Sequence, residues 1–125
     1  MPVGPAAVRG GRAGRVARAL PALRGRLRHA HGFQPDAAAG LRESPPESIR
    51  RFYFDTVTHD PELLRALIDF AGADRVLLGT DYPFDMADPE PLATVRACGL
   101  DPAEEAAVVG ENATALLGLR APVHR

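Results

Sequence analysis

The chain of 125 residues has no lysine, and all 15 of its basic residues are arginine. It has one cysteine, Cys98, which excludes an intramolecular disulfide framework. No apolar run reaches the roughly 18 residues that a membrane-spanning helix requires. The N-terminus lacks both the continuous apolar stretch of a secretory signal and the serines of a transit peptide. These absences predict a cytoplasmic protein without a membrane segment.

Acidic residues are scarce at the start of the chain. The first 51 residues hold ten arginines and three acidic residues, whereas residues 52–125 hold five arginines and 13 acidic residues. One interpretation of this asymmetry is a nucleic-acid-binding module, because the arginines at positions 9 to 18 recur every three residues. Since no aromatic residues or known nucleic-acid motif accompany them, we favour a disordered or loosely ordered Arg-rich segment over residues 1–16.

The hydrophobic content of 46% is ordinary for a globular domain, which we expect over residues 17–125. Leucines at three- and four-residue spacing predict a helix over residues 17–30 that starts near Pro21. Glycines and prolines over residues 32–47 predict a connection. Aromatic and β-branched residues over 51–57 then predict a strand buried on both faces.

A helix is expected after Asp60 and Pro61, which suit the cap and first positions of a helix. Gly72 would end it, and its apolar stripe would consist of Leu63, Leu64, Leu67, Ile68 and Ala71. Residues 75–80 form a second short apolar run, typical of a strand. Further helices are expected over 90–98, 102–109 and 112–118, with Gly110 as a break.

The expected order of strand, helix and strand defines a βαβ unit with two parallel strands. Asp55 and Asp81 each lie where one of these strands ends. In α/β proteins the chemistry sits at the carboxyl ends of the strands. Asp81 is therefore the leading candidate for a functional carboxylate, although an Asp-Tyr-Pro loop also favours aspartate for turn geometry alone. Asp55 is expected to accept hydrogen bonds from nearby loop amides.

Residues 52–56 (FYFDT), the His59-Asp60-Pro61 helix start and above all residues 78–84 (LGTDYPF) resemble the amidohydrolase-related family. Within it they are most similar to aminocarboxymuconate semialdehyde decarboxylase-like enzymes. The segment 110–118 (GENATALLG) also resembles the closing helix of that family. The resemblance implies an α/β fold in which the chain is the C-terminal portion, with the last two strands and helices, of a TIM-like (β/α)8 barrel.

The resemblance also implies functional residues. Asp81 matches the aspartate that binds or lies beside a catalytic divalent metal, usually zinc, and it would serve as metal ligand and proton acceptor. Arg26 follows a Leu-Arg-Gly run that resembles a family segment whose arginine binds the substrate carboxylate in a neighbouring subunit. His59 does not match a family ligand and is expected to face solvent.

Several parts of the family's site are missing from the sequence. The His29-Ala-His31 pair follows an arginine-rich helix rather than a first barrel strand, and Arg15-Val-Ala-Arg18 stands where a catalytic histidine is expected. One aspartate cannot hold zinc, which needs three or four ligands. We therefore expect no tight metal site and little catalysis from the chain alone, as for a fragment, a frameshifted gene or a misplaced start.

The sequence is compatible with three functions. The first is a truncated metal-dependent carboxy-lyase or hydrolase that acts on a small carboxylate substrate. The second is a non-catalytic partner, which would form a homo-oligomer, pair with an intact homologue, or complement an N-terminal fragment through unpaired strand edges. The third is the nucleic-acid-binding module, which would show steeply salt-dependent binding.

Overall fold

The computed structural model describes residues 23–32 and 43–119. The expected disordered segment 1–16 and the start of the first expected helix lie outside these residues. Within them the elements are a helix over 23–32, α3 (Pro45–Ile49), β1 (Phe54–Asp55), α4 (Pro61–Ala71), η1 (Ala73–Arg75), β2 (Val76–Leu77), α5 (Pro91–Arg96), α6 (Pro102–Ala106), the π-helical turn η2 (Ala107–Glu111) and α7 (Asn112–Leu117).

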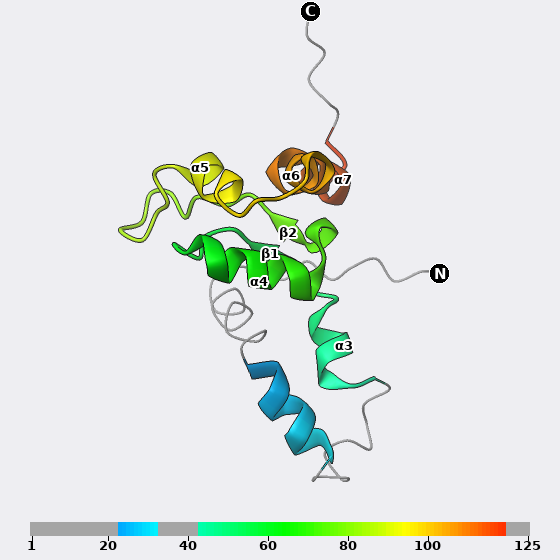
Figure 1. Ribbon diagram of the computed structural model, residues 1–125. Helices are drawn as coiled ribbons and strands as arrows, with labels where there is room; N and C mark the ends of the chain where they lie inside the picture. Colours follow the sequence, from blue (N-terminus) through cyan, green and yellow to red (C-terminus); the bar gives the residue numbers. More distant parts are fainter. Residues whose placement is uncertain (1–22, 33–42, 120–125) are drawn as a thin grey trace, which may run out of the picture.

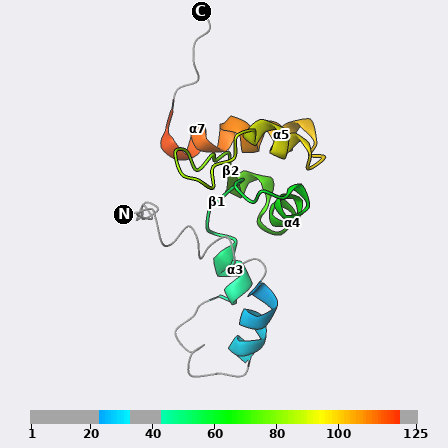
Figure 2. The ribbon, with the colours of Figure 1, turned by 90° about the vertical axis from the view of Figure 1, so that its left-hand side faces the viewer.

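The two strands pair in parallel, with Phe54 opposite Val76 and Asp55 opposite Leu77. This confirms the expected βαβ unit, although each strand has only two residues. Figures 1 and 2 show the strands between α4 on one side and α6 and α7 on the other. Across the described ranges, every helix is too short or too polar to span a lipid bilayer.

The core lies on one face of this small sheet. Phe54 and Val76 point into it from the strands, and α4 supplies the largest share. Successive side chains of a strand point to opposite faces, so Asp55 and Leu77 are directed away from this core. The buried cluster consists of Ile49, Phe54, Leu64, Leu67, Ile68, Phe70, Val76, Val95 and Val108.

Helix α4 begins and ends where the sequence predicts. Oδ1 of Asp60 accepts hydrogen bonds from the amides of Glu62 (2.9 Å) and Leu63 (3.1 Å), which are free donors at a helix N-terminus. Gly72 ends the helix with a φ of 95°, which favours glycine. The expected place of Leu63 in the apolar stripe is wrong, because this side chain is 52% exposed.

Replacing the cap Asp60 with alanine is expected to lower the free energy of unfolding by about 1 kcal/mol, because two amide donors lose their acceptor. Asp60→Asn keeps an acceptor oxygen and should cost less than half as much. Urea unfolding of the full chain followed by circular dichroism measures both. Equal stability of Asp60→Ala and the wild type would contradict the cap's importance.

Two helical segments differ from the sequence prediction. Residues 45–49 form α3, although 45–47 were predicted as part of a connection. Proline is tolerated in a first turn, and the Glu47 carboxylate accepts hydrogen bonds from both the amide (2.9 Å) and the hydroxyl (2.7 Å) of Ser44. These hydrogen bonds lower the pKa of Glu47. Gly110, expected to break the chain's helical course, lies inside η2.

The π-helical turn has a physical cause in the neighbouring strand. The backbone carbonyl of Val108 accepts a hydrogen bond from the amide of Leu78 at 3.0 Å. The amide of Asn112, which would bond to Val108 in a regular α-helix, bonds to the carbonyl of Ala107 instead. The Leu78 amide thus takes the place of a helical donor at the Val108 carbonyl, and this hydrogen bond attaches η2 to the end of β2.

Candidate functional site

The candidate site lies at the carboxyl ends of β1 and β2, and we call Asp55, Thr56, His59, Gly79 and Asp81 the strand-end site. The loops that leave the two strands run along the same side of the molecule, on the left in Figure 1. The parallel pairing continues past the strands, because the Thr56 amide donates to the Leu77 carbonyl at 3.1 Å.

Thr56 holds the two strand ends together with its side chain as well. Its hydroxyl accepts a hydrogen bond from the Gly79 amide (3.1 Å) and donates one to the Gly79 carbonyl (3.3 Å). Thr56 is fully buried and Gly79 is half-buried, so these bonds partly replace water for both backbone groups of Gly79. Thr56 was not predicted as a site residue from the sequence, in which it lies between Asp55 and Val57 at the strand end.

Gly79 allows the close approach of the two strands. A Cβ atom at this position would lie 3.1 Å from Cβ of Asp55 and 3.3 Å from Cγ2 of Val57, tighter than ordinary van der Waals contact. The absence of a side chain therefore places the end of β2 directly against Asp55. The chain then continues through Thr80 to Asp81.

Asp81 has an unusual backbone and an unengaged carboxylate. Its φ of 59° lies in the left-handed region, where non-glycine residues are uncommon and aspartate is among the tolerated ones. Among the residues that the structure describes, Asp81 is the one half-buried acidic side chain without a hydrogen-bond or ion-pair partner. Its carboxylate is therefore available to a ligand, whereas the other half-buried and buried acidic groups serve the fold.

Asp55 and His59 complete the strand-end site. Oδ1 of Asp55 accepts a hydrogen bond from the Val57 amide at 2.9 Å, which confirms the expected bonding to a loop amide. His59 is exposed, as expected, but its Nε2 lies 2.7 Å from the carbonyl oxygen of Met86 in the loop that follows Asp81. This contact joins residues 27 positions apart, and no sequence pattern predicts it.

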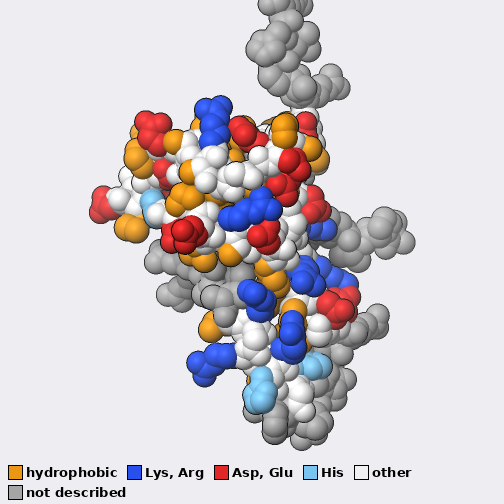
Figure 3. Space-filling model, viewed as in Figure 1, with side chains coloured by type: hydrophobic (Ala, Val, Ile, Leu, Met, Phe, Trp, Pro, Cys, Tyr) orange, Lys and Arg blue, Asp and Glu red, His pale blue; other side chains and the backbone are white. Residues whose placement is uncertain are grey.

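The other residues singled out in the sequence lie elsewhere. Arg26, His29 and His31 belong to the helix over 23–32, which α4 separates from the β2–α5 loop in Figures 1 and 2. Arg26 is exposed, and no contact joins it to Asp81. In Figure 3 basic side chains gather over this helix and α3, and acidic side chains are more frequent over the upper part of the molecule.

The donor set for a metal is incomplete in this part of the chain. Within residues 23–32 and 43–119, no three His, Cys, Asp or Glu side chains come together as metal ligands would. The remaining segments add only Asp36 and His124 of these residue types. A structural or catalytic zinc needs three or four protein ligands. The described residues therefore do not fit a complete metal centre.

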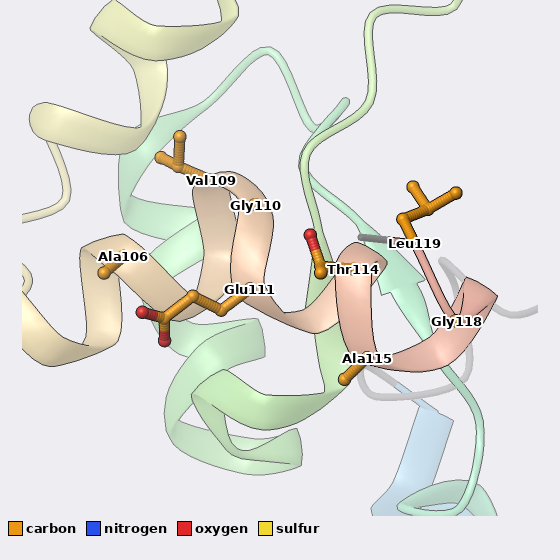
Figure 4. Close-up of a pocket in the computed structure, with 8 residues that line it drawn as sticks. All are labelled: Ala106, Val109, Gly110, Glu111, Thr114, Ala115, Gly118 and Leu119. Carbon is orange, nitrogen blue, oxygen red and sulfur yellow. The ribbon is translucent and has the colours of Figure 1, made fainter. Parts of the chain in front are cut away.

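Two other features lie apart from the strand-end site. Cys98 donates through Sγ to the carbonyls of Pro61 (3.4 Å) and Thr94 (3.3 Å), and burial raises the pKa of its thiol, which disfavours the nucleophilic thiolate. A shallow groove runs along α6, η2 and α7 (Figure 4). Its lining is mostly Ala, Gly, Val and Leu, and Glu111 and Thr114 point away from each other in it.

A parallel βαβ unit with polar residues gathered at its strand ends defines an α/β protein of the kind that carries its chemistry at that edge. The chain belongs to the amidohydrolase family, which it matches over residues 4–119. This confirms the family expected from residues 52–61 and 78–84.

Curated relatives are decarboxylases. The chain is 37% identical over 73 residues to the 2-amino-3-carboxymuconate-6-semialdehyde decarboxylase of Caenorhabditis elegans, which is 58% of this chain and 18% of that protein. It is 32% identical over 102 residues to the protein of the same name from Dictyostelium discoideum, 80% of this chain and 28% of that protein. The chain thus spans less than a third of the length of either relative.

A solved structure shares the fold. The crystal structure of Metarhizium anisopliae IDCase in apo form matches with a TM-score of 0.66 and 27% sequence identity. The match covers 81% of this chain and 32% of that one. The βαβ unit and the helices after it thus have the arrangement of an amidohydrolase-type structure.

Proposed function

We propose that the chain supplies the last two strands and helices of an amidohydrolase-type (β/α)8 barrel whose complete form decarboxylates a small carboxylate substrate. The observation that carries this proposal is Asp81, a half-buried carboxylate without a partner among the described residues, at the end of a parallel strand. The names of both curated relatives, which describe a decarboxylase, support the reaction class.

Asp81 is proposed as an active-site carboxylate that binds a divalent metal, zinc, together with ligands from outside the described residues, and that accepts a proton. The amidohydrolase family is generally metal-dependent. Because the described residues do not form a complete donor set, we expect the chain alone to bind metal weakly and to have little activity.

Arg26 is proposed as a binding residue for the substrate carboxylate in an adjacent subunit. A guanidinium matches a carboxylate with two parallel hydrogen bonds. Arg26 is exposed and lies on a helix away from the β2–α5 loop, so it would reach a site on another molecule rather than its own. Such an arrangement would make oligomer formation a condition of substrate binding.

A segment exchange tests the proposed function. The 102-residue segment of the Dictyostelium relative that matches this chain is replaced with the corresponding segment of this chain. We expect the hybrid to release carbon dioxide from 2-amino-3-carboxymuconate-6-semialdehyde, whereas the 125-residue chain alone does not. The substrate is taken from the name of the relative.

The hybrid must fold before its activity is informative. Cooperative thermal unfolding and the same oligomeric state as the unmodified relative establish that it does. A folded hybrid with no detectable decarboxylation, at a detection limit of about a thousandth of the relative's rate, would contradict the proposed function. Robust decarboxylation by the isolated chain would contradict the proposed need for residues outside it.

A further inference from the structure

His59 and Asp81 occupy equivalent positions at the ends of the two strands. Asp55 pairs with Leu77, and His59 and Asp81 each lie four residues beyond their member of this pair. Their φ angles are also nearly the same, 56° for His59 and 59° for Asp81. Among the described residues, these two are the non-glycine positions with positive φ. The segments after β1 and β2 therefore turn in the same way as they leave the sheet.

The loop that contains Asp81 is closed by its own backbone. The Asp88 amide donates to the Thr80 carbonyl at 2.8 Å, and the amides of Phe84 and Ala87 donate within the loop at 3.0 Å and 2.9 Å. The carboxylate of Asp88 is buried and accepts from the Thr94 hydroxyl at 2.8 Å, which fixes the far end of the loop to α5.

The middle of this loop has little apolar attachment to the core. Tyr82, Phe84 and Met86 are 82%, 69% and 65% exposed, so their side chains do not anchor it. The hydrogen bond between His59 Nε2 and the Met86 carbonyl, at 2.7 Å, spans from the β1–α4 loop to this middle part. Because a carbonyl only accepts, Nε2 must carry the proton and donate.

We propose that His59 is a positioning residue that fixes the loop over residues 80–88 and thereby the orientation of the Asp81 carboxylate. The loop is held at its base by Thr56 and Gly79, at its far end by Asp88, and in its middle by His59. The consequence for catalysis rests on the proposed function, but the effect on the loop does not.

Hydrogen exchange on the full-length chain tests the positioning role directly. His59→Asn keeps a residue that tolerates the left-handed backbone but has a shorter side chain. We expect exchange of the amides of Phe84, Ala87 and Asp88 to become about three- to tenfold faster, as for the loss of one hydrogen bond. His59→Gln, which is long enough to donate to Met86, should restore most of the protection.

The matched control is His31→Asn, the same chemical change in the helix over 23–32, which should leave exchange over 80–88 unchanged. Amides of α6 and α7 should exchange at the wild-type rate in all variants, which shows that the fold is intact. Unchanged amide exchange over 80–88 in His59→Asn would overturn the proposal. Identical exchange in His59→Asn and His59→Gln would overturn it as well, and so would faster exchange of amides throughout the chain.

The hybrid enzyme supplies a second and separate measurement. His59→Asn is expected to lower its kcat about three- to tenfold with KM within twofold, and His59→Gln to recover most of the loss. An inactive hybrid with accelerated loop exchange in His59→Asn would contradict the proposed function and leave the positioning role supported. An active hybrid with unchanged loop exchange in His59→Asn would support the proposed function and contradict the positioning role.

Discussion

Replacing Asp81 with asparagine is expected to lower kcat of the hybrid decarboxylase at least 100-fold, the scale of a general acid–base or charged active-site group. Asparagine has the same size and tolerates the left-handed backbone that this position adopts, so the loop should keep its shape. What the substitution removes is the negative charge and the ability to take a proton. Steady-state kinetics of the purified hybrid measure the effect.

Asp85→Asn is the matched control for this experiment. Asp85 lies in the same loop, is exposed, and has no partner among the residues described, so its substitution removes the same charge four positions away. We expect kcat of Asp85→Asn within about twofold of the parent hybrid. Equal losses in the two variants would point to the charge of the loop as a whole and would remove Asp81 from its proposed role.

The structure explains why a change of a few atoms at Asp81 should matter so much. Gly79 and Thr56 set the position of the chain two residues before Asp81, and the hydrogen bond of Asp88 to Thr80 closes the loop after it. A carboxylate placed by backbone bonds on both sides has little freedom to adjust. Preorganised groups of this kind contribute more to catalysis than mobile ones.

Features set by local chemistry were predictable from the sequence. Asp60, Pro61 and Gly72 act on the backbone within a few residues, so the bounds of α4 follow from the helix signals alone. The position of Asp81 was also predictable, because an aspartate after an apolar run in a βαβ pattern falls at the end of a strand, whereas its role as a metal ligand and proton acceptor stays a prediction. The bounds of α4 and the position of Asp81 both depend on residues that are neighbours in the sequence.

Features set by distant contacts were not predictable. The π-helical turn exists because the Leu78 amide, 30 residues upstream, takes the Val108 carbonyl. The side-chain amide of Asn112 similarly donates to the carbonyls of Ala73 (2.7 Å) and Val76 (2.8 Å), which attaches α7 to the edge of β2. The role of His59 depends on Met86 in the same way. No periodicity or local propensity encodes such pairs.

Thr56→Val is expected to lower the free energy of unfolding by about 2–4 kcal/mol, the largest loss of stability among the substitutions considered. Valine has nearly the shape of threonine, so packing changes little. The buried hydroxyl, however, bonds to both the amide and the carbonyl of Gly79, which is half-buried. Without it the amide and the carbonyl of Gly79 lose this partner in a part-buried place, at about 1–2 kcal/mol each.

Thr56→Ser separates the hydroxyl from the methyl group of the same side chain. Serine keeps both hydrogen bonds to Gly79 and loses one buried methyl, for which we expect about 1 kcal/mol. Urea unfolding of the full-length chain should therefore rank the proteins wild type, Thr56→Ser, then Thr56→Val. If valine were tolerated as well as serine, the two strand ends would be held by packing alone, and the fixed base proposed for the Asp81 loop would lose its support.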